Sequence, residues 1–236
     1  MPCFDTISSI DPSCPASWHG KQFLTFDIDW AHDAVLANVI DLVTDAGVAA
    51  TWFVTHATPL LARLRANPLF ELGVHPNFNP LLVGEGGADN NAAGILEQIC
   101  QIVPEARAVR SHSLVMSERL VDVFRDAGLQ RVCNSFIPAE SGATCVPWKL
   151  WDNMIVIPHC WQDNVAMRLH GVVQPPPPGH GLRVYDFHPI HVYLNTPTVA
   201  TYEAARPFFQ QPDMLARHRV VQERGTRDIL RQILEC

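Results

Sequence analysis

Acidic, basic and imidazole side chains recur in this sequence at the C-terminal ends of short apolar runs. The residues in question are Asp27, Asp29, His75, Arg110 and His188. Side chains of these types bind metal ions and transfer protons in enzymes. None of them is unusual by itself, but their joint occurrence at matching positions favours one site with a metal ion, a base and an acid.

Asp27 and Asp29 are two residues apart in a segment that we expect to be extended, so both carboxylates point to roughly the same side. Two facing carboxylates repel each other unless a cation or a shared proton lies between them. This favours a metal-ligand role for one and a base role for the other. Capping of the helix that follows is an alternative for Asp29, but it explains Asp27 poorly, because Asp27 lies inside an apolar run.

The other three side chains complete the set in different ways. A lone histidine after an apolar strand, such as His75, is more often a core or loop residue, but beside a carboxylate it becomes a candidate zinc ligand. Arg110 at a buried strand end needs an anionic partner, and Asp27 is the expected one. His188, close to Asp186 in the sequence, is a candidate general acid or base.

Strands and helices that alternate along the chain must position these side chains. Apolar runs predict strands within 21–28, 48–56, 69–75, 106–110, 129–134, 151–158 and 182–189. Amphipathic segments predict helices within 31–47, 58–67, 92–102, 117–128 and 214–234, and loops are expected at 83–94 and 174–181. This alternation is typical of an α/β domain with parallel strands, a barrel or partial barrel, whose chemistry lies at the C-terminal strand ends. We expect it over 21–236, after an irregular lead-in over 1–20.

Composition and charge exclude several classes of protein. The formal net charge is −7, from 17 Lys and Arg against 24 Asp and Glu, which disfavours binding to nucleic acid or to an anionic membrane surface. No run approaches the ~20 apolar residues that span a bilayer, and the N-terminus has no secretory pattern, so we expect a cytoplasmic protein. The seven cysteines form no CxxC pair, which argues for reduced thiols and against a structural zinc knuckle.

Four segments resemble the motifs of the NodB-homology polysaccharide deacetylases, which are metal-dependent carbohydrate esterases with an incomplete (β/α) barrel. They are Thr25-Phe26-Asp27-Ile28-Asp29, Glu71–His75 with Asn79 behind it, Arg110–Ser113, and Phe187–His191. They occur in the family's order, and the likeness covers about residues 21–195. The segment DFHPIHVYLN resembles the corresponding segment in a branch of the family whose genes occur with surface-polysaccharide biosynthesis genes.

The resemblance implies an incomplete or distorted (β/α) barrel that hydrolyses an N-acetyl group on a carbohydrate, a surface-polysaccharide precursor. It implies that Asp27 is the base, held in place by Arg110, and that His188 protonates the leaving amine. A fourth family motif is indistinct here, and either Trp151-Asp152 or Trp161–Asn164 could take its place.

A divalent metal ion, with zinc expected, is implied by the same resemblance, and its ligands would be Asp29, His75 and Asn79. Asn79 stands where the family has a second histidine, and an amide oxygen is a weaker ligand for zinc. His56 or His112 could therefore be the third ligand, and both are also candidate substrate-binding residues.

Aromatic side chains beside the expected ligands could stack on a sugar ring, with Trp30 and Phe78 the best placed. Three interpretations follow from the resemblance. The first is an active, metal-dependent deacetylase, and the second is a catalytically reduced relative that only binds a glycan or a partner. The third is the same scaffold acting on an amide that is not part of a sugar.

Overall fold

The computed structural model describes residues 3–87, 91–177 and 181–235. Both predicted loops, 83–94 and 174–181, fall partly outside these described residues. No helix in the described parts of the chain has the length and apolar character needed to cross a bilayer.

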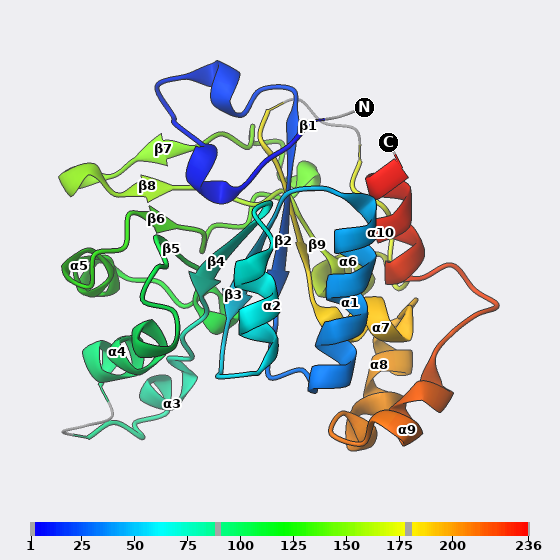
Figure 1. Cartoon of the computed structure of the whole chain (residues 1–236). Coiled ribbons are helices and arrows are strands. Elements are labelled where there is room, and N and C mark those ends of the chain that lie inside the picture. The colour runs from blue at the N-terminus through cyan, green and yellow to red at the C-terminus, as the bar shows by residue number, and fades with distance from the viewer. Residues whose placement is uncertain (1–2, 88–90, 178–180, 236) are drawn as a thin grey trace.

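One curved sheet organises the molecule (Figure 1). Its strands are β1 (Cys3–Phe4), β2 (Lys21–Asp27), β3 (Ala50–Val54), β4 (Phe70–Val74), β5 (Ala108–Val109), β6 (Arg131–Val132), β7 (Trp148–Lys149), β8 (Ile155–Val156), β9 (Trp161–Gln162) and β10 (Arg183–Phe187). Their order is β7-β8-β6-β5-β4-β3-β2-β10-β9, with β1 beside the start of β2. All neighbouring pairs are parallel except β7 and β8.

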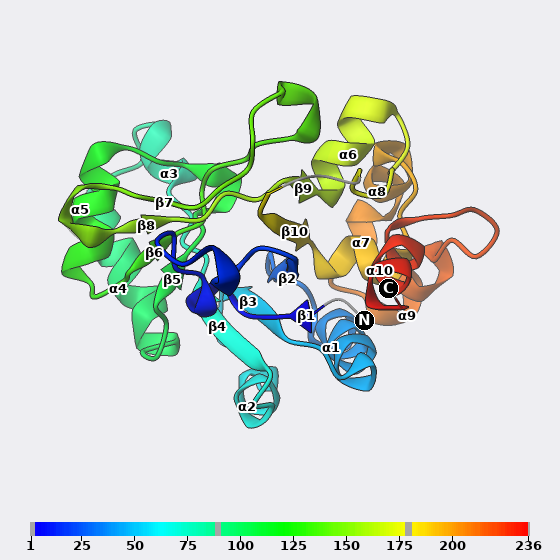
Figure 2. The ribbon, with the colours of Figure 1, turned by 90° about the horizontal axis from the view of Figure 1, so that it is seen from above.

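Helices cover the outer face of this sheet, as the view from above shows for α1, α2, α4 and α5 (Figure 2). The α-helices are α1 (Asp33–Ala46), α2 (Leu60–Ala66), α3 (Asn79–Leu82), α4 (Ala92–Ile102), α5 (Glu118–Asp126), α6 (Asp163–His170), α7 (Pro189–Leu194), α8 (Val199–Ala205), α9 (Pro212–Leu215) and α10 (Thr226–Glu235). Short 3-10 helices lie at Ile7–Ser9, Pro15–Ser17, His112–Leu114, Ala139–Ser141, Trp151–Asn153, Arg206–Phe208 and Ala216–His218.

Alternate residues of the central strands pack in two different layers. A larger apolar cluster joins the sheet to the outer helices and includes Phe26, Trp52 and Val39. The other cluster lies inside the curve of the sheet, and we call it the interior cluster: Ile7, Ile10, Trp18, Phe23, Phe53, Ala108, Cys133, Cys145, Ile157, Leu182 and Val184. The strands are therefore buried on both faces, which explains their nearly continuous apolar sequences.

The predicted fold, an α/β incomplete barrel in one domain, is confirmed. The strand order ends at β7 on one side and β9 on the other, and no ladder between these two strands closes the barrel in the described residues. Parallel pairing brings the carboxyl ends of β2, β3, β4 and β10 to one edge. That edge is where the sequence placed the reactive side chains.

Two details of the expected organisation differ. The segment 1–20 is mostly irregular, but β1 pairs with β2, and Ile7 and Ile10 are completely buried. The single helix predicted over 214–234 is wrong, because α9 and α10 are separate elements. Between them, Val220 N donates to Leu194 O, and the Asn195 side-chain amide donates to Val220 O, so tertiary hydrogen bonds replace helical ones.

Candidate active site

A carboxylate and two imidazoles meet at the C-terminal edge of the sheet. Asp29 Oδ1 lies 3.2 Å from His75 Nε2 and 3.1 Å from His112 Nδ1. The two ring nitrogens are 3.3 Å apart. One oxygen and two imidazole nitrogens around one point form a donor set that suits zinc, and these three residues form one of the Asp/His groups able to hold a metal ion.

The backbone turns sharply where β2 ends and presents Asp29 to this cluster. Asp29 and Trp30 both adopt left-handed conformations, with φ of 40° and 53°. Such conformations are strained for residues other than glycine, so the surrounding contacts must hold them. Trp30 N donates to Thr55 Oγ1, and Gln210 Nε2 donates to Trp30 O. Asp29 is not a helix cap, since His32 Nδ1 accepts the hydrogen bond from Ala34 N at the start of α1.

The charges in the cluster support one another. Burial would raise the pKa of Asp29, but hydrogen bonds from His112 and His75 hold it well below its usual value. The hydrogen bond to Asp29 in turn raises the pKa of His112. Asp29 is therefore an ionised carboxylate at neutral pH, which is the form that binds a cation.

Arg110 lies fully buried beneath this cluster and binds the carboxylate that the sequence predicted. Its Nη1 donates to Asp27 Oδ1 at 2.9 Å and to Thr25 Oγ1 at 2.9 Å. The same atom donates to Asp186 Oδ1 at 2.6 Å. Burial, together with the neighbouring Asp27, raises the pKa of Asp186 well above its usual value despite Arg110.

Asp27 lies between the arginine and the imidazole cluster. Its second oxygen, Oδ2, is 3.6 Å from His75 Nδ1, and the residue is 2% exposed. It nevertheless lines the cleft described below. A carboxylate held by Arg110 on one side and facing the cleft on the other is placed to accept a proton.

His188, which follows β10, is held by a residue from the fourth motif that the sequence left open. Its Nδ1 lies 2.7 Å from Asp163 Oδ1, and its backbone N–H donates to Asp163 Oδ2 at 2.8 Å. The other ring nitrogen, Nε2, lies 3.5 Å from Asp29 Oδ2. Burial disfavours the imidazolium, but the carboxylates of Asp163 and Asp29 raise the pKa of His188 well above its usual value.

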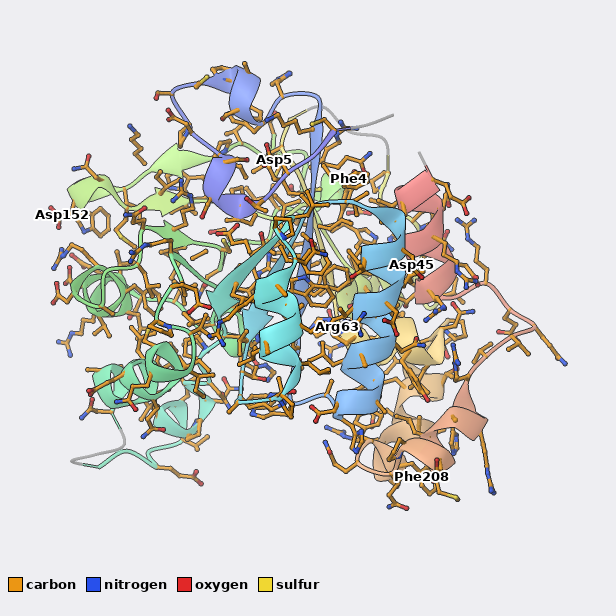
Figure 3. The ribbon with its side chains drawn as sticks, viewed as in Figure 1. Phe4, Asp5, Asp45, Arg63, Asp152 and Phe208 are labelled. Carbon is orange, nitrogen blue, oxygen red and sulfur yellow. The ribbon has the colours of Figure 1, made fainter. Side chains whose placement is uncertain are left out.

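The structure separates the two candidates for the fourth motif. Asp163, in the segment 161–164, contacts His188, whereas Asp152 forms a 2.5 Å ion pair with Arg125 on α5. Figure 3 shows Asp152 at the outer edge of the molecule. Asp163 was missed as a site residue, and its only signal in the sequence was its place in one of the two candidate segments.

Three sequence-predicted residues lie away from the Asp29 cluster. Asn79 begins α3, and its Nδ2 donates to Ser113 Oγ; none of the described contacts joins it to Asp29 or His75. Phe78 is 1% exposed and packs on Phe124, so it has no free face for a sugar. The Nδ1 atom of His56 lies 2.8 Å from Thr55 Oγ1, behind the Trp30 turn.

Trp30 lies at the cleft as expected. Its side chain is 41% exposed, and its ring meets the His112 ring edge to face, with the centroids 5.2 Å apart. His112 therefore contacts Asp29 on one side and the Trp30 ring on the other.

The cleft has two lobes that meet over the Asp29 cluster. The aromatic lobe, of about 350 Å³, has Trp30, Ile190, His191 and Phe209 in its wall, and the polar lobe, of about 370 Å³, is walled in part by Asp27, His75, Ser111 and Gln162. Six residues line both lobes: Asp29, His112, Asn164, Arg168, His188 and Tyr202. Cavities of this size are common for small-molecule ligands.

Comparison with known proteins found a matching family model and a similar solved structure. A family model described as WbmS-like polysaccharide deacetylase matches residues 24–206. The chain is 44% identical to a protein from Bordetella bronchiseptica described as an inferred polysaccharide deacetylase involved in O-antigen biosynthesis. The match covers 98% of this chain and 97% of that chain, with a TM-score of 0.92. No curated protein matches the chain.

Two further solved structures from Bacillus anthracis share less with the chain. A family 4 carbohydrate esterase is 16% identical, with a TM-score of 0.46 over 85% of this chain and 78% of that one. A pseudoenzyme of the same esterase family is 14% identical, with a TM-score of 0.42 over 84% of this chain and 60% of that one. The resemblance drawn from the motifs is confirmed by the family model and by the Bordetella protein. The chain therefore belongs to the WbmS-like polysaccharide deacetylase family.

Proposed function

We propose that the chain is a metal-dependent N-deacetylase that hydrolyses an acetamide on a carbohydrate precursor of a surface polysaccharide. One observation carries the proposal: a single cleft is lined by the Asp29 cluster, by Asp27 and by His188, and the buried residues Arg110 and Asp163 hold the last two side chains in place. The relation to a protein described in O-antigen biosynthesis supports the class of substrate. The cytoplasmic location expected from the sequence stays a prediction.

The metal ion would be held by Asp29, His75 and His112, with His112 in place of the expected Asn79. When bound, a divalent ion polarises the amide carbonyl and lowers the pKa of water. Zinc is the expected ion, because its protein ligands are typically imidazole and carboxylate.

The protein's own residues supply the proton transfers. Asp27 accepts a proton from the attacking water, while Arg110 fixes the position of the carboxylate. The water oxygen bonds to the carbonyl carbon, and the bond from this carbon to nitrogen breaks. His188 donates its proton to the leaving nitrogen, and Asp163 keeps the ring in the required orientation. The products are acetate and an amino sugar.

Bound metal per chain is the first measurement, made by elemental analysis of protein purified without chelator. We expect near-stoichiometric metal in the parent chain and loss of metal in His75→Ala and His112→Ala. Asn79→Ala is the matched control and should retain its metal, since Asn79 contacts Ser113 instead. Loss of metal from Asn79→Ala with retention in His112→Ala would contradict the ligand set proposed here.

A catalytically reduced, glycan-binding protein is the second candidate, and the asparagine at position 79 is the observation that favours it. Chain that takes up no metal, even after incubation with zinc, would support this candidate. Metal together with acetate release from an N-acetylated sugar would exclude it. Asn79→His separates the two further, because a gain of metal affinity would show that a side chain at position 79 can reach the metal and that the parent site is weakened.

A further inference from the structure

We propose that the sugar bound by this cleft carries an anionic group, a carboxylate or a phosphate, and that Arg168 and Tyr202 form the subsite for it. This inference rests on the proposed function, because it names the substrate class for the same cleft. Both residues line the aromatic lobe and the polar lobe, so they stand beside the point where the acetamide would react.

Arg168 is a cation in the cleft without an ion-pair partner among the described residues. The other arginines near the site are engaged: Arg110 binds Asp27 and Asp186, and Arg206 binds Glu203. Arg168 lies on α6, whose first residue, Asp163, is fixed to His188 by two hydrogen bonds. The start of the helix that carries Arg168 is therefore fixed relative to His188.

Two other polar side chains that line the same cleft as Arg168 have an atom without a hydrogen-bond partner. His191 is 4% exposed, its Nδ1 has no hydrogen-bond partner, and its ring lies 4.7 Å from the Tyr202 ring. Asn164, which lines both lobes, has a buried amide oxygen that is also unpartnered. A buried polar atom without a partner costs free energy, so these groups favour a polar ligand.

The positive charge of the unpaired arginine favours an anionic group on the ligand. The aromatic lobe contains the carboxylate of Glu203 and the amide of Gln210, but Glu203 is paired with Arg206, and Gln210 donates to Trp30 O. The guanidinium of Arg168 and the hydroxyl of Tyr202 remain as donors, and arginine binds carboxylates and phosphates in a forked geometry. Apolar side chains such as Met167 and Ile190 leave room for the less polar face of a sugar ring.

Binding at equilibrium tests the subsite separately from catalysis. The ligands are N-acetylglucosamine, its 1-phosphate and its 6-carboxylate (the uronic acid), titrated by calorimetry at one fixed ionic strength. The protein is the zinc-loaded Asp27→Asn chain, in which turnover should be blocked while the subsite is intact. The variants are Arg168→Met and Arg107→Met, the second as a control, because Arg107 lines a cavity at the opposite end of the sheet.

We expect at least one anionic sugar to bind about tenfold more tightly than the neutral sugar, which corresponds to about 1.4 kcal/mol. Arg168→Met should abolish this preference, and Arg107→Met should retain it. Comparison of the phosphate with the carboxylate identifies the source of the charge. Equal affinity for all three sugars, or a preference that survives Arg168→Met, would overturn the inference.

Acetate release by the parent chain, measured with the same three sugars, reports on the proposed function alone. Absence of acetate with a preserved anion preference would count against the deacetylase and in favour of the subsite. Acetate release at equal rates from neutral and anionic sugars, with equal affinities, would support the deacetylase and count against the anion subsite.

Discussion

A single guanidinium nitrogen of Arg110 donates to two buried carboxylates, Asp27 and Asp186. Two ionised carboxylates against one guanidinium would leave a net negative charge in a buried site, which is strongly unfavourable. The raised pKa of Asp186 resolves this, because a protonated Asp186 leaves one negative charge facing one positive charge. The ion pair that remains is the one between Arg110 and Asp27.

Asp27→Asn is expected to remove the base while preserving the shape of the site. The rate of acetate release should fall by about 10²- to 10⁴-fold, the usual contribution of a general base. Bound metal should be unchanged, because Asp27 is not among the three residues of the Asp29 cluster. Asp152→Asn, at an exposed carboxylate, is the control and should keep full activity. Normal turnover in Asp27→Asn would contradict the base assignment.

His159 gives a pH dependence of stability that can be measured. Burial, and then the charge of Arg110, lowers the pKa of His159 well below its usual value, and its ring stacks on Phe136. The unfolded chain takes up this proton near pH 6.5, before the folded chain does. The stability contributed by the neutral ring is therefore present above about pH 6.5 and is lost as the pH falls toward the folded-state pKa.

His159→Phe should keep the stacking contact and remove this loss. Between about pH 7.5 and about pH 5.5, the free energy of unfolding should fall by about 1.4 kcal/mol less in the variant than in the parent. Urea unfolding at both pH values measures the difference, with His19→Phe, at an exposed ring, as the control. An identical pH dependence in His159→Phe and the parent would refute the interpretation.

At the scale of elements, the first strands and helices could be predicted because their signals are local. β2, β3 and β4 are apolar runs of five to seven residues, and α1 ends at Gly47 in a left-handed conformation. The later strands β5, β6, β8 and β9 are two residues long, so their pairing depends on tertiary neighbours. α6, α7 and α8 were missed in this less regular part of the chain.

The candidate site divides in the same way. Asp27 ends β2, Asp29 lies two residues later and His75 follows β4, and the structure brings the three together as the sequence suggested. Asn79 and His112 could not be ranked from the sequence, because both lie in short helical turns whose direction no periodicity fixes. The start of α3 directs Asn79 to Ser113, and the turn after β5 directs His112 to Asp29.

Gly73, in β4, allows the neighbouring strands β3 and β5 to pack closely against it. A Cβ at this position would lie 2.7 Å from two ring carbons of Phe53 and 3.0 Å from the Ala108 carbonyl oxygen. The Phe53 ring itself lies 4.5 Å from the Arg110 guanidinium, so displacement of the ring would disturb the buried pair. Only glycine leaves room for both contacts.

Gly73→Ala should therefore lower both stability and activity. Overpacking of this kind typically destabilises by about 1–3 kcal/mol, which a thermal or urea unfolding curve resolves. Acetate release should fall as well, because Phe53 would press on Arg110. Gly87→Ala is the matched control, since a Cβ there meets nothing within 4 Å. Unchanged stability in Gly73→Ala would contradict this prediction and show that β3 and β5 can shift to make room for the methyl group.

At the scale of the whole molecule, the segments that follow β10 form one wall of the cleft. The chain crosses from β10 into α7 and α8, which place His191 and Tyr202 in the aromatic lobe. Asn195 then ties this region to the C-terminal helix, because its side chain donates to Asp228 Oδ2 and accepts from Arg227 N. The barrel thus supplies the Asp29 cluster and Asp27, and the C-terminal segments supply one side of the cleft.

The opposite end of the barrel is closed by the N-terminal segment, which was expected to be a mere lead-in. Ile7 N donates to Thr51 Oγ1, and Ser8 N donates to Glu71 Oε2 at 3.0 Å. Ile7 and Ile10 are buried in the interior cluster with Phe53, and the Arg110 guanidinium packs over the Phe53 ring. The interior cluster therefore links the N-terminal segment to Arg110 through the Phe53 ring.

Ile10→Ala should destabilise the whole domain by about 2–5 kcal/mol, the usual cost of emptying a buried aliphatic position. The transition should stay cooperative, because the interior cluster joins the N-terminal segment to the central strands. Val221→Ala, at a side chain that is 87% exposed, should change the free energy of unfolding by less than about 0.5 kcal/mol. A urea unfolding curve for Ile10→Ala that overlays the parent curve would mean that the segment 1–20 is an appendage. A large, single-step shift would make it part of the catalytic domain, since the layer it completes also supports the Arg110–Asp27 pair.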